Sequence, residues 1–324
     1  VSTKDAITVD LKGKHIYPAF IDLYSDYGMP EVKRTDNADA PKKGAFGWNQ
    51  AIKSEVEAQK LFLHNQQKAD ELRKLGFGAV LTVQKDGIVR GSGALVNLAN
   101  AKENESIIKD RAAAFYSFNK GSSPQDYPSS LMGAIALLRQ TYYDAIWYKA
   151  NATKTEYNIS LEAFNKLQEL PSIFEGNDKY NDIRGKKVGD EFKVKYIIKG
   201  GGNEYQRLYD IQSTFSKYII PVNFPEAIDV EDPLDAEQAS LTDLKHWEMA
   251  PANLAMLEKN YVSFCITTAD LKDKSVFLKN IRKAIKYGLS EKTALRALTY
   301  NPANFIGVQD KVGSLKQGML ANFF

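Results

Sequence analysis

Segments with helical and strand-like spacing of apolar residues alternate through the second half of the chain, and this alternation restricts the fold more than any other feature. Helices are predicted over 161–170, 182–191 and 204–215, and a short apolar strand follows each of them, over 172–175, 195–199 and 218–223. A helix between two strands returns the chain to the edge at which the next strand can start in the same direction. Three such units in a row therefore predict an α/β fold, a parallel sheet with helices outside it.

The rest of the chain continues this alternation of helices and strands, except for the polar residues 100–130. Residues 56–75 have helical spacing and end at Gly76, and a strand is predicted directly after them. The polar residues 100–130 are predicted to be an excursion without a strand. The other predicted elements are strands over 78–83, 94–98 and 262–268, helices over 131–149 and 247–260, and a loop over 225–245.

Length and composition favour one large domain. A chain of 324 residues, 44% of them hydrophobic, can bury the core of a full α/β barrel. The net charge of +3 is small and spread along the sequence, so no nucleic-acid partner is indicated. No apolar run approaches the roughly 18 residues that a membrane span requires. The single cysteine, Cys265, lies in an apolar segment, which excludes an intrachain disulfide bond and predicts a buried thiol.

Motifs at both ends of the chain resemble one enzyme family. Residues 13–26 read GKHIYPAFIDLYSD, which is similar to the first barrel strand of metal-dependent amidohydrolases. Residues 294–322 contain ALRALT, NPA and GSLKQGMLAN, which resemble the closing motifs of the same superfamily, with the imidazolonepropionase-like branch nearest. The resemblance implies a TIM-like (β/α) barrel of the metal-dependent hydrolase type, flanked by a small β-sandwich. It places a sandwich remnant at 1–15, the barrel at 16–305 and the return strand of the sandwich at 306–324.

The metal site implied by the resemblance is incomplete in this sequence. The family draws its ligands from a His-x-His pair on the first strand, often a carboxylated lysine, two later histidines and a late aspartate. Tyr24 and Asp26 stand in place of the pair and are predicted to share one face of the strand. Asp26 can bind a hard cation, whereas a neutral tyrosine is a poor ligand. The only histidines are His15, His64 and His246, so four histidine ligands cannot be assembled and the metal site is expected to be degenerate.

Asp270 is the one position that matches a catalytic residue of the family. The segment FCITTAD, residues 264–270, resembles the late family strand whose aspartate binds metal and accepts a proton from the attacking water. The same carboxylate can instead hold backbone amides at the end of the strand. The sequence leaves both interpretations open.

Four further residues are predicted to contact a ligand, because active sites of such barrels lie at the carboxyl ends of the strands. Glu175 and Lys199 end two adjacent predicted strands, where the nearest relatives have histidines, and we expect them to pair as charges across the barrel mouth. Asn223 ends the next strand, and Trp48 lies in the loop after the first strand. These four residues are the predicted substrate-binding set.

Two hypotheses of different classes follow. If the chain is active, the resemblance implies hydrolysis of non-peptide carbon–nitrogen bonds with Zn or Mn as cofactor, Asp270 as base and Asp26 as an oxygen ligand. The alternative is a pseudoenzyme without a cofactor, a barrel that acts as a structural or binding partner of a second amidohydrolase domain or chain, which completes the β-sandwich. A third interpretation, a metal site made only of carboxylates, requires Asp26, Glu175 and Asp270 to converge.

The ends of the sequence and the nearest relatives give two further expectations. Residues 1–10 and 323–324 read as interrupted β elements, so the chain is expected to be part of something longer. The relatives imply a bacterial protein outside the cytoplasm, periplasmic or secreted. The small-molecule ligand is not indicated by the sequence.

Overall fold

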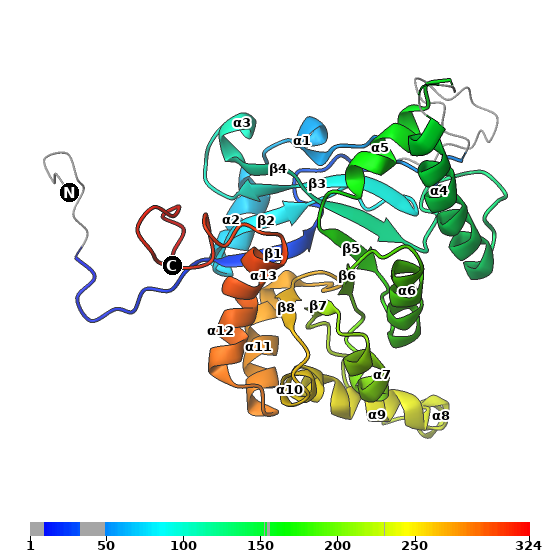
Figure 1. The fold of residues 1–324 in the computed structure, drawn as a ribbon. Helices are drawn as coiled ribbons and strands as arrows, with labels where there is room; N and C mark the ends of the chain where they lie inside the picture. Colours follow the sequence, from blue (N-terminus) through cyan, green and yellow to red (C-terminus); the bar gives the residue numbers. More distant parts are fainter. Residues whose placement is uncertain (1–9, 33–48, 152, 154–155, 230) are drawn as a thin grey trace, which may run out of the picture.

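One sheet organises the molecule (Figure 1). The computed structural model describes residues 10–32, 49–151, 153, 156–229 and 231–324. Within these residues, eight strands hydrogen-bond to one another in the order in which they occur along the chain. The strands are β1 (Phe20–Ser25), β2 (Phe77–Thr82), β3 (Val89–Asn97), β4 (Ile107–Ser117), β5 (Ser172–Glu175), β6 (Tyr196–Lys199), β7 (Lys217–Pro221) and β8 (Phe264–Thr267). The predicted α/β fold with a mostly parallel sheet is confirmed.

Strand β3 is the exception to the parallel order. It pairs antiparallel with β2 on one side and with β4 on the other. The predicted strand over 94–98 is therefore part of β3, but it runs opposite to its neighbours. The prediction that 100–130 contains no strand is wrong, because Ile107–Ser117 forms β4, the longest strand of the sheet. Its first half contains the charged run Lys109, Asp110 and Arg111 and is partly exposed, and antiparallel neighbours need no crossover helix that would have marked the strand.

The two outer strands of the sheet order, β1 and β8, lie next to each other and are joined by the side chain of Asp22. This fully buried carboxylate accepts hydrogen bonds from Thr267 Oγ1 at 2.6 Å, from Thr268 Oγ1 at 2.7 Å and from the Thr268 amide at 2.9 Å. It also accepts one from the Tyr24 amide at 3.0 Å. An eight-stranded sheet whose outer strands are linked in this way is consistent with the predicted TIM-like barrel.

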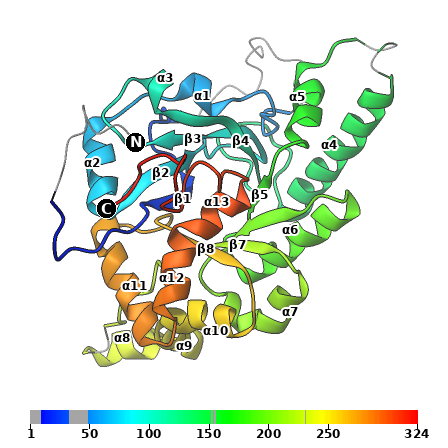
Figure 2. The same ribbon diagram turned by 60° about the vertical axis from the view of Figure 1, so that its left-hand side comes forward.

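Helices cover one face of the sheet (Figures 1 and 2). Several begin at side chains that bond the first free backbone amides, namely Asn65, Asn158, Asp178, Ser240 and Ser290. The helices are α1 (Ala58–Leu61), α2 (Gln66–Lys74), α3 (Glu103–Ser106), α4 (Leu131–Asn151), α5 (Ile159–Leu167), α6 (Lys179–Glu191), α7 (Leu208–Ser213), α8 (Pro233–Gln238), α9 (Leu241–Met249), α10 (Asn253–Lys259), α11 (Phe277–Lys286), α12 (Glu291–Leu298) and α13 (Tyr300–Phe305), with 3-10 turns at Glu204–Arg207, Ala250–Ala252 and Lys274–Val276.

Three predicted boundaries in these helices are wrong. The helix predicted over 56–75 is divided into α1 and α2 by extended backbone at Phe62 and Asn65. The loop predicted over 225–245 contains α8 and the start of α9. The helix predicted over 247–260 is divided between α9 and α10 by a 3-10 turn that contains Pro251, which lacks an amide hydrogen to donate. No helix in the described part of the chain is long and apolar enough to cross a membrane.

Both faces of the sheet are buried, which explains why its strands read as continuous apolar runs. In β6 to β8, alternate residues enter two separate clusters. Ile197, Ile219 and Cys265 lie in one cluster, and their neighbours Ile198, Ile220 and Ile266 lie in the other, beneath the helices. The predicted buried thiol is confirmed, and burial raises the pKa of Cys265 well above its usual value.

The segments before β1 and at 322–324 pair with each other. Tyr17 and Phe324 exchange two backbone hydrogen bonds of 3.0 Å, and the Ala19 amide donates to Asn322 O at 2.9 Å. This antiparallel contact brings the two ends of the described chain together. The β-sandwich predicted for 1–15 and 306–324 stays a prediction, and residues 1–9 lie outside the described part.

Candidate functional site at the mouth of the sheet

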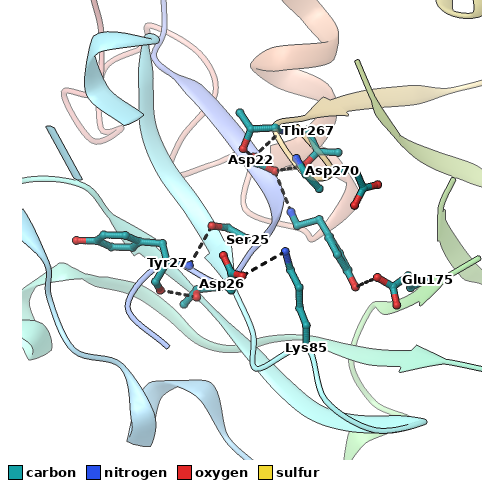
Figure 3. Close-up of polar contacts among 12 residues, drawn as sticks. Asp22, Ser25, Asp26, Tyr27, Lys85, Glu175, Thr267 and Asp270 are labelled. Carbon is teal, nitrogen blue, oxygen red and sulfur yellow. Dashed lines mark hydrogen bonds and ion pairs between the residues drawn. The ribbon is translucent and has the colours of Figure 1, made fainter. Parts of the chain in front are cut away.

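The carboxyl ends of the parallel strands lie at one rim of the sheet, and β3 begins at the same rim because it runs in the opposite direction. Tyr24 comes from β1, Lys85 and Arg90 from the β2–β3 connection and the start of β3, Glu175 from β5 and Lys199 from β6. We call this group of five residues the mouth. Figure 3 shows Lys85 and Glu175 directed toward the same region, with Asp270 nearby.

Arg90, Glu175 and Tyr24 form a closed network of short hydrogen bonds. Arg90 Nη2 donates to Glu175 Oε2, Arg90 Nη1 donates to the Tyr24 hydroxyl, and that hydroxyl donates to Glu175 Oε1, each at 2.6 Å. Ser117 Oγ adds a 3.1 Å bond to Glu175 Oε2, and Arg90 Nε donates to Gly87 O at 3.0 Å. The guanidinium and the carboxylate are almost fully shielded from water, with side-chain exposures of 3% and 11%.

The electrostatics of this network keep Glu175 ionised. Burial alone would raise the pKa of Glu175, but the charge of Arg90 and the hydrogen bonds from Tyr24 and Arg90 outweigh it and lower the pKa to about 2. Burial raises the pKa of Tyr24 well above its usual value, so the phenol keeps its proton. The network therefore consists of a permanent anion, a permanent cation and a neutral phenol.

Lys199 forms the second ion pair of the mouth. Its side chain is fully buried, and its ammonium group contacts the carboxylate of Asp270 and donates to Asn177 Oδ1 at 2.5 Å. Asp270 lies three residues after β8, in the left-handed backbone region with φ 64°, and its side chain is 42% exposed. We expected Lys199 to pair with Glu175, but each has another partner, because the reversed strand β3 supplies Arg90 to Glu175.

Tyr24 and Asp26 do not form a matched pair. Tyr24 lies in β1 and is 2% exposed, whereas Asp26 follows the last residue of the strand and its side chain is 64% exposed. The Asp26 carboxylate lies 3.9 Å from the ammonium group of Lys85, and that ammonium group is 4.7 Å from the centre of the Tyr24 ring. Burial lowers the pKa of Lys85, although nearby carboxylates oppose the shift.

The other predicted residues that the structure describes make no contact with this network. Asn223 follows β7, and its side-chain oxygen lies beside Gly202. Trp48 lies outside the described residues. His64 and His246 bond the hydroxyl groups of Tyr27 and Tyr205, at 3.0 and 3.2 Å, and His15 is exposed. None of the three histidines belongs to the mouth.

The side chains of the mouth do not fit a divalent metal. Among the residues that the structure describes, no three His, Cys, Asp or Glu side chains lie close enough to share a metal ion. The interpretation that Asp26, Glu175 and Asp270 converge on a metal is therefore wrong. Each of these carboxylates faces a cation of the protein itself, Lys85, Arg90 or Lys199. A metal ion placed among them would be repelled by those three charges.

Two glycines after β5 and β6 make room for another buried carboxylate. A Cβ atom on Gly176 would lie 2.0 Å from Asp182 Oδ1, and one on Gly200 would lie 3.2 Å from Asp182 Oδ2 and 2.1 Å from Glu204 Oε1. Asp182 is fully buried, and neither oxygen has a hydrogen-bond partner in the described part of the chain. Burial and the charge of Glu204 raise the pKa of Asp182 well above its usual value.

Sequence reasoning did not identify Arg90, Ser117, Asn177 or Asp182. Arg90 had a usable signal, because it is the one charged residue in the otherwise apolar or small run 88–98. A single arginine in a buried strand requires a buried partner. The other three residues had no comparable signal, since their roles depend on which strands become neighbours.

Comparisons with known proteins agree with this fold. The model of the amidohydrolase family matches residues 244–324. No curated protein sequence matches the chain. Among solved structures, the chain is similar to an amidohydrolase from Thermotoga maritima MSB8, with 22% identity and a TM-score of 0.74 over 100% of this chain and 84% of that one.

Two more distant structural matches also span the whole chain. One is a further amidohydrolase, with 14% identity and a TM-score of 0.51, and the other is a prolidase complexed with N-methylphosphonate-L-proline, with 14% identity and a TM-score of 0.50. Each match covers 100% of this chain and 82% of the other protein. The family model confirms the predicted resemblance to amidohydrolases for the C-terminal motifs, and the structural matches agree with the predicted fold. The imidazolonepropionase-like branch stays a prediction.

Proposed function

We propose that this chain, an amidohydrolase-superfamily protein by its matched C-terminal part and its fold, is a pseudoenzyme that has kept the barrel and lost the metal chemistry. The superfamily activity is hydrolysis of non-peptide carbon–nitrogen bonds, assisted by a divalent metal. The observation that carries the proposal is that Arg90 and Lys199 neutralise the two carboxylates, Glu175 and Asp270, at strand ends where the family binds its metal.

The donor set supports this proposal. A catalytic metal needs about three protein ligands with free lone pairs and an open position for water. The Tyr24 hydroxyl is protonated and donates to Glu175, whose oxygens accept from Tyr24, Arg90 and Ser117. The ligand positions are therefore occupied by hydrogen bonds within the protein.

The pKa of Glu175 also supports a pseudoenzyme. A general base works best when its pKa is near the operating pH. Glu175, with a pKa of about 2, is too weak a base to activate water at neutral pH. One oxygen of the Asp270 carboxylate is already engaged in an ion pair with the buried ammonium of Lys199. Without a metal, Glu175 does not support attack of water on an amide.

The role left to the chain is structural or binding. A folded barrel with a stable ion-pair network can position or complete a second amidohydrolase domain or chain, and it can hold a small molecule in its mouth. The backbone pairing of Tyr17 with Phe324 and of Ala19 with Asn322 supports the first of these roles, because it holds the segment before β1 beside residues 322–324, next to the region in which the β-sandwich is predicted.

Metal content decides between the pseudoenzyme and an active hydrolase. The purified chain is dialysed against zinc and, separately, manganese, and bound metal is measured by elemental analysis beside an Asp270→Ala variant. We expect substoichiometric metal in both proteins and no hydrolysis of carbon–nitrogen substrates. One metal ion per chain that is lost in Asp270→Ala would overturn the proposal and support a hydrolase in which Asp270 is a ligand.

A further inference from the structure

Lys85 is the cation of the mouth whose hydrogen-bonding capacity is not used. Arg90 donates to Gly87 O, Tyr24 and Glu175, and Lys199 is engaged by Asn177 and Asp270. The Lys85 ammonium has three donors, yet in the part of the chain that the structure describes it makes no hydrogen bond. Its contacts are the face of the Tyr24 ring and the Asp26 carboxylate at 3.9 Å.

The partly buried ammonium group of Lys85 would be stabilised by a hydrogen-bond acceptor. The Lys85 side chain is 27% exposed, and burial lowers its pKa, so it has lost much of its hydration without gaining a strong partner in return. Figure 3 shows its amino group pointing toward Asp26. The carboxylate at that distance lies beyond hydrogen-bonding range, and it is itself largely in water.

A cavity opens beside Lys85. Its volume is about 910 Å³, and it lies between the segment after β1, helix α2 and the segment after β8. Apolar side chains line much of it, among them Met29, Val32, Leu72, Leu75 and Leu271. Its volume lies in the range of small-molecule sites, and its lining combines these apolar side chains with charged ones.

The polar groups of the cavity favour a negative ligand. Besides Lys85, it is lined by Lys68, Lys74, Lys272 and Lys274, and none of these four lysines forms an ion pair with another described residue. Four carboxylates, Asp26, Glu31, Glu71 and Asp273, also line it. Asp273 already accepts from the amide and hydroxyl of Ser275. Of the five lysines, Lys85 is the one that also belongs to the mouth.

We infer that this cavity binds a small organic acid, with one carboxylate on the Lys85 ammonium and an apolar body against Met29, Leu72 and Leu271. A single negative charge fits better than two, because Asp26, Glu175 and Asp270 all act on the same ammonium group. The inference rests on the proposed function, since a metal at the mouth would bring its own positive charge and its own ligands.

The test uses one probe and its neutral analogue. Binding of 4-phenylbutyrate and of 4-phenylbutanamide, which has the same shape without the charge, is measured by calorimetry on the intact chain. The variants are Lys85→Met, Lys85→Arg and, as a control, Lys166→Met, which removes a surface ammonium that pairs with Glu162 on α5. Circular dichroism and thermal unfolding establish that each variant is folded.

We expect the acid to bind at least about tenfold more tightly than the amide, and Lys85→Met to abolish that preference by losing a charge-assisted hydrogen bond. Lys85→Arg should keep most of the preference for the acid over the amide, and Lys166→Met should keep all of that preference. Equal binding of acid and amide, an unchanged preference in Lys85→Met, or no binding of the acid would overturn the inference. Tighter binding of inorganic phosphate than of the acid would overturn the assignment to carboxylates.

Metal analysis of the same protein sample separates the two proposals. Absence of metal together with absence of acid binding contradicts only the organic-acid site. A stoichiometric metal ion contradicts the proposed function, whatever the calorimetry shows.

Discussion

Arg90 and Arg139 each form an ion pair with a glutamate at 2.6 Å, but the two pairs differ in their access to water. The side chains of Arg90 and Glu175 are 3% and 11% exposed, and those of Arg139 and Glu191 are 47% and 30% exposed. Removal of one partner from a buried pair leaves an uncompensated charge in a medium of low dielectric constant. Removal of one partner from an exposed pair leaves a charge in water.

We predict that Arg90→Met lowers the free energy of unfolding by about 3–5 kcal/mol. Arg139→Met should change it by about 1 kcal/mol or less. Urea unfolding followed by circular dichroism measures both. Similar losses in the two variants would show that burial does not control the strength of the Arg90–Glu175 pair.

The Glu175 carboxylate makes the free energy of unfolding depend on pH. The pKa of Glu175 is about 2 in the folded chain and about 4.5 in the unfolded chain, so its contribution to stability is fully present above pH 4.5 and is lost as the pH falls toward 2. A shift of this size corresponds to on the order of 3 kcal/mol. We predict that the stability difference between the wild type and Glu175→Gln shrinks over this range. A difference that stays constant in unfolding measurements across the same pH range would contradict the prediction.

At the scale of elements, β3 depends on close contact with the segment before α1. The Lys53 amide donates to Val89 O at 2.8 Å, and the Ser92 amide donates to Val56 O at 2.9 Å. Between these bonds lies Gly91, with φ 73°, where an added Cβ atom would lie 1.9 Å from Val56 O. A left-handed conformation and a missing side chain are both required here.

Gly91→Ala should therefore cost more than an equivalent change in open space. Gly307 has a similar φ of 66°, and nothing lies within 4 Å of its added Cβ atom. We predict a loss of about 1 kcal/mol for Gly307→Ala, from backbone strain alone, and a loss of about 3 kcal/mol or more for Gly91→Ala. Thermal and urea unfolding give the two values. Equal losses would mean that the segment around Val56 moves away at little cost.

At the scale of the whole molecule, Asp22 links the first strand to the last. Its carboxylate accepts four hydrogen bonds in a fully buried position, and three of them come from Thr267 and Thr268. We predict that Asp22→Ala lowers the free energy of unfolding by about 3–5 kcal/mol, because it leaves several buried donors unpaired. Hydrogen exchange should accelerate first in β1 and β8. Uniform acceleration in all strands would argue against a local link.

The sequence predicted those parts of the fold that depend on local periodicity. The units between 161 and 223 were recognised because each strand is apolar and each helix has a regular spacing. Strand β4 was missed because three charged residues in a row interrupt its apolar pattern, and the direction of β3 has no local signature. The site was missed for the same reason, since Arg90 reaches Glu175, 85 positions away, only because β3 is reversed.

Because β3 is reversed, two of the cations of the mouth come from one short segment of the chain. Residues 83–90 comprise the turn between β2 and β3 and the first two residues of β3, and this one segment supplies both Lys85 and Arg90. These two cations can therefore be exchanged together by grafting a new segment of the same length over residues 83–90, while Lys199 on β6 stays in place. Substitutions within this single hairpin would therefore convert a barrel whose mouth holds the positive charges of Lys85 and Arg90 into one whose carboxylates need a bound cation instead.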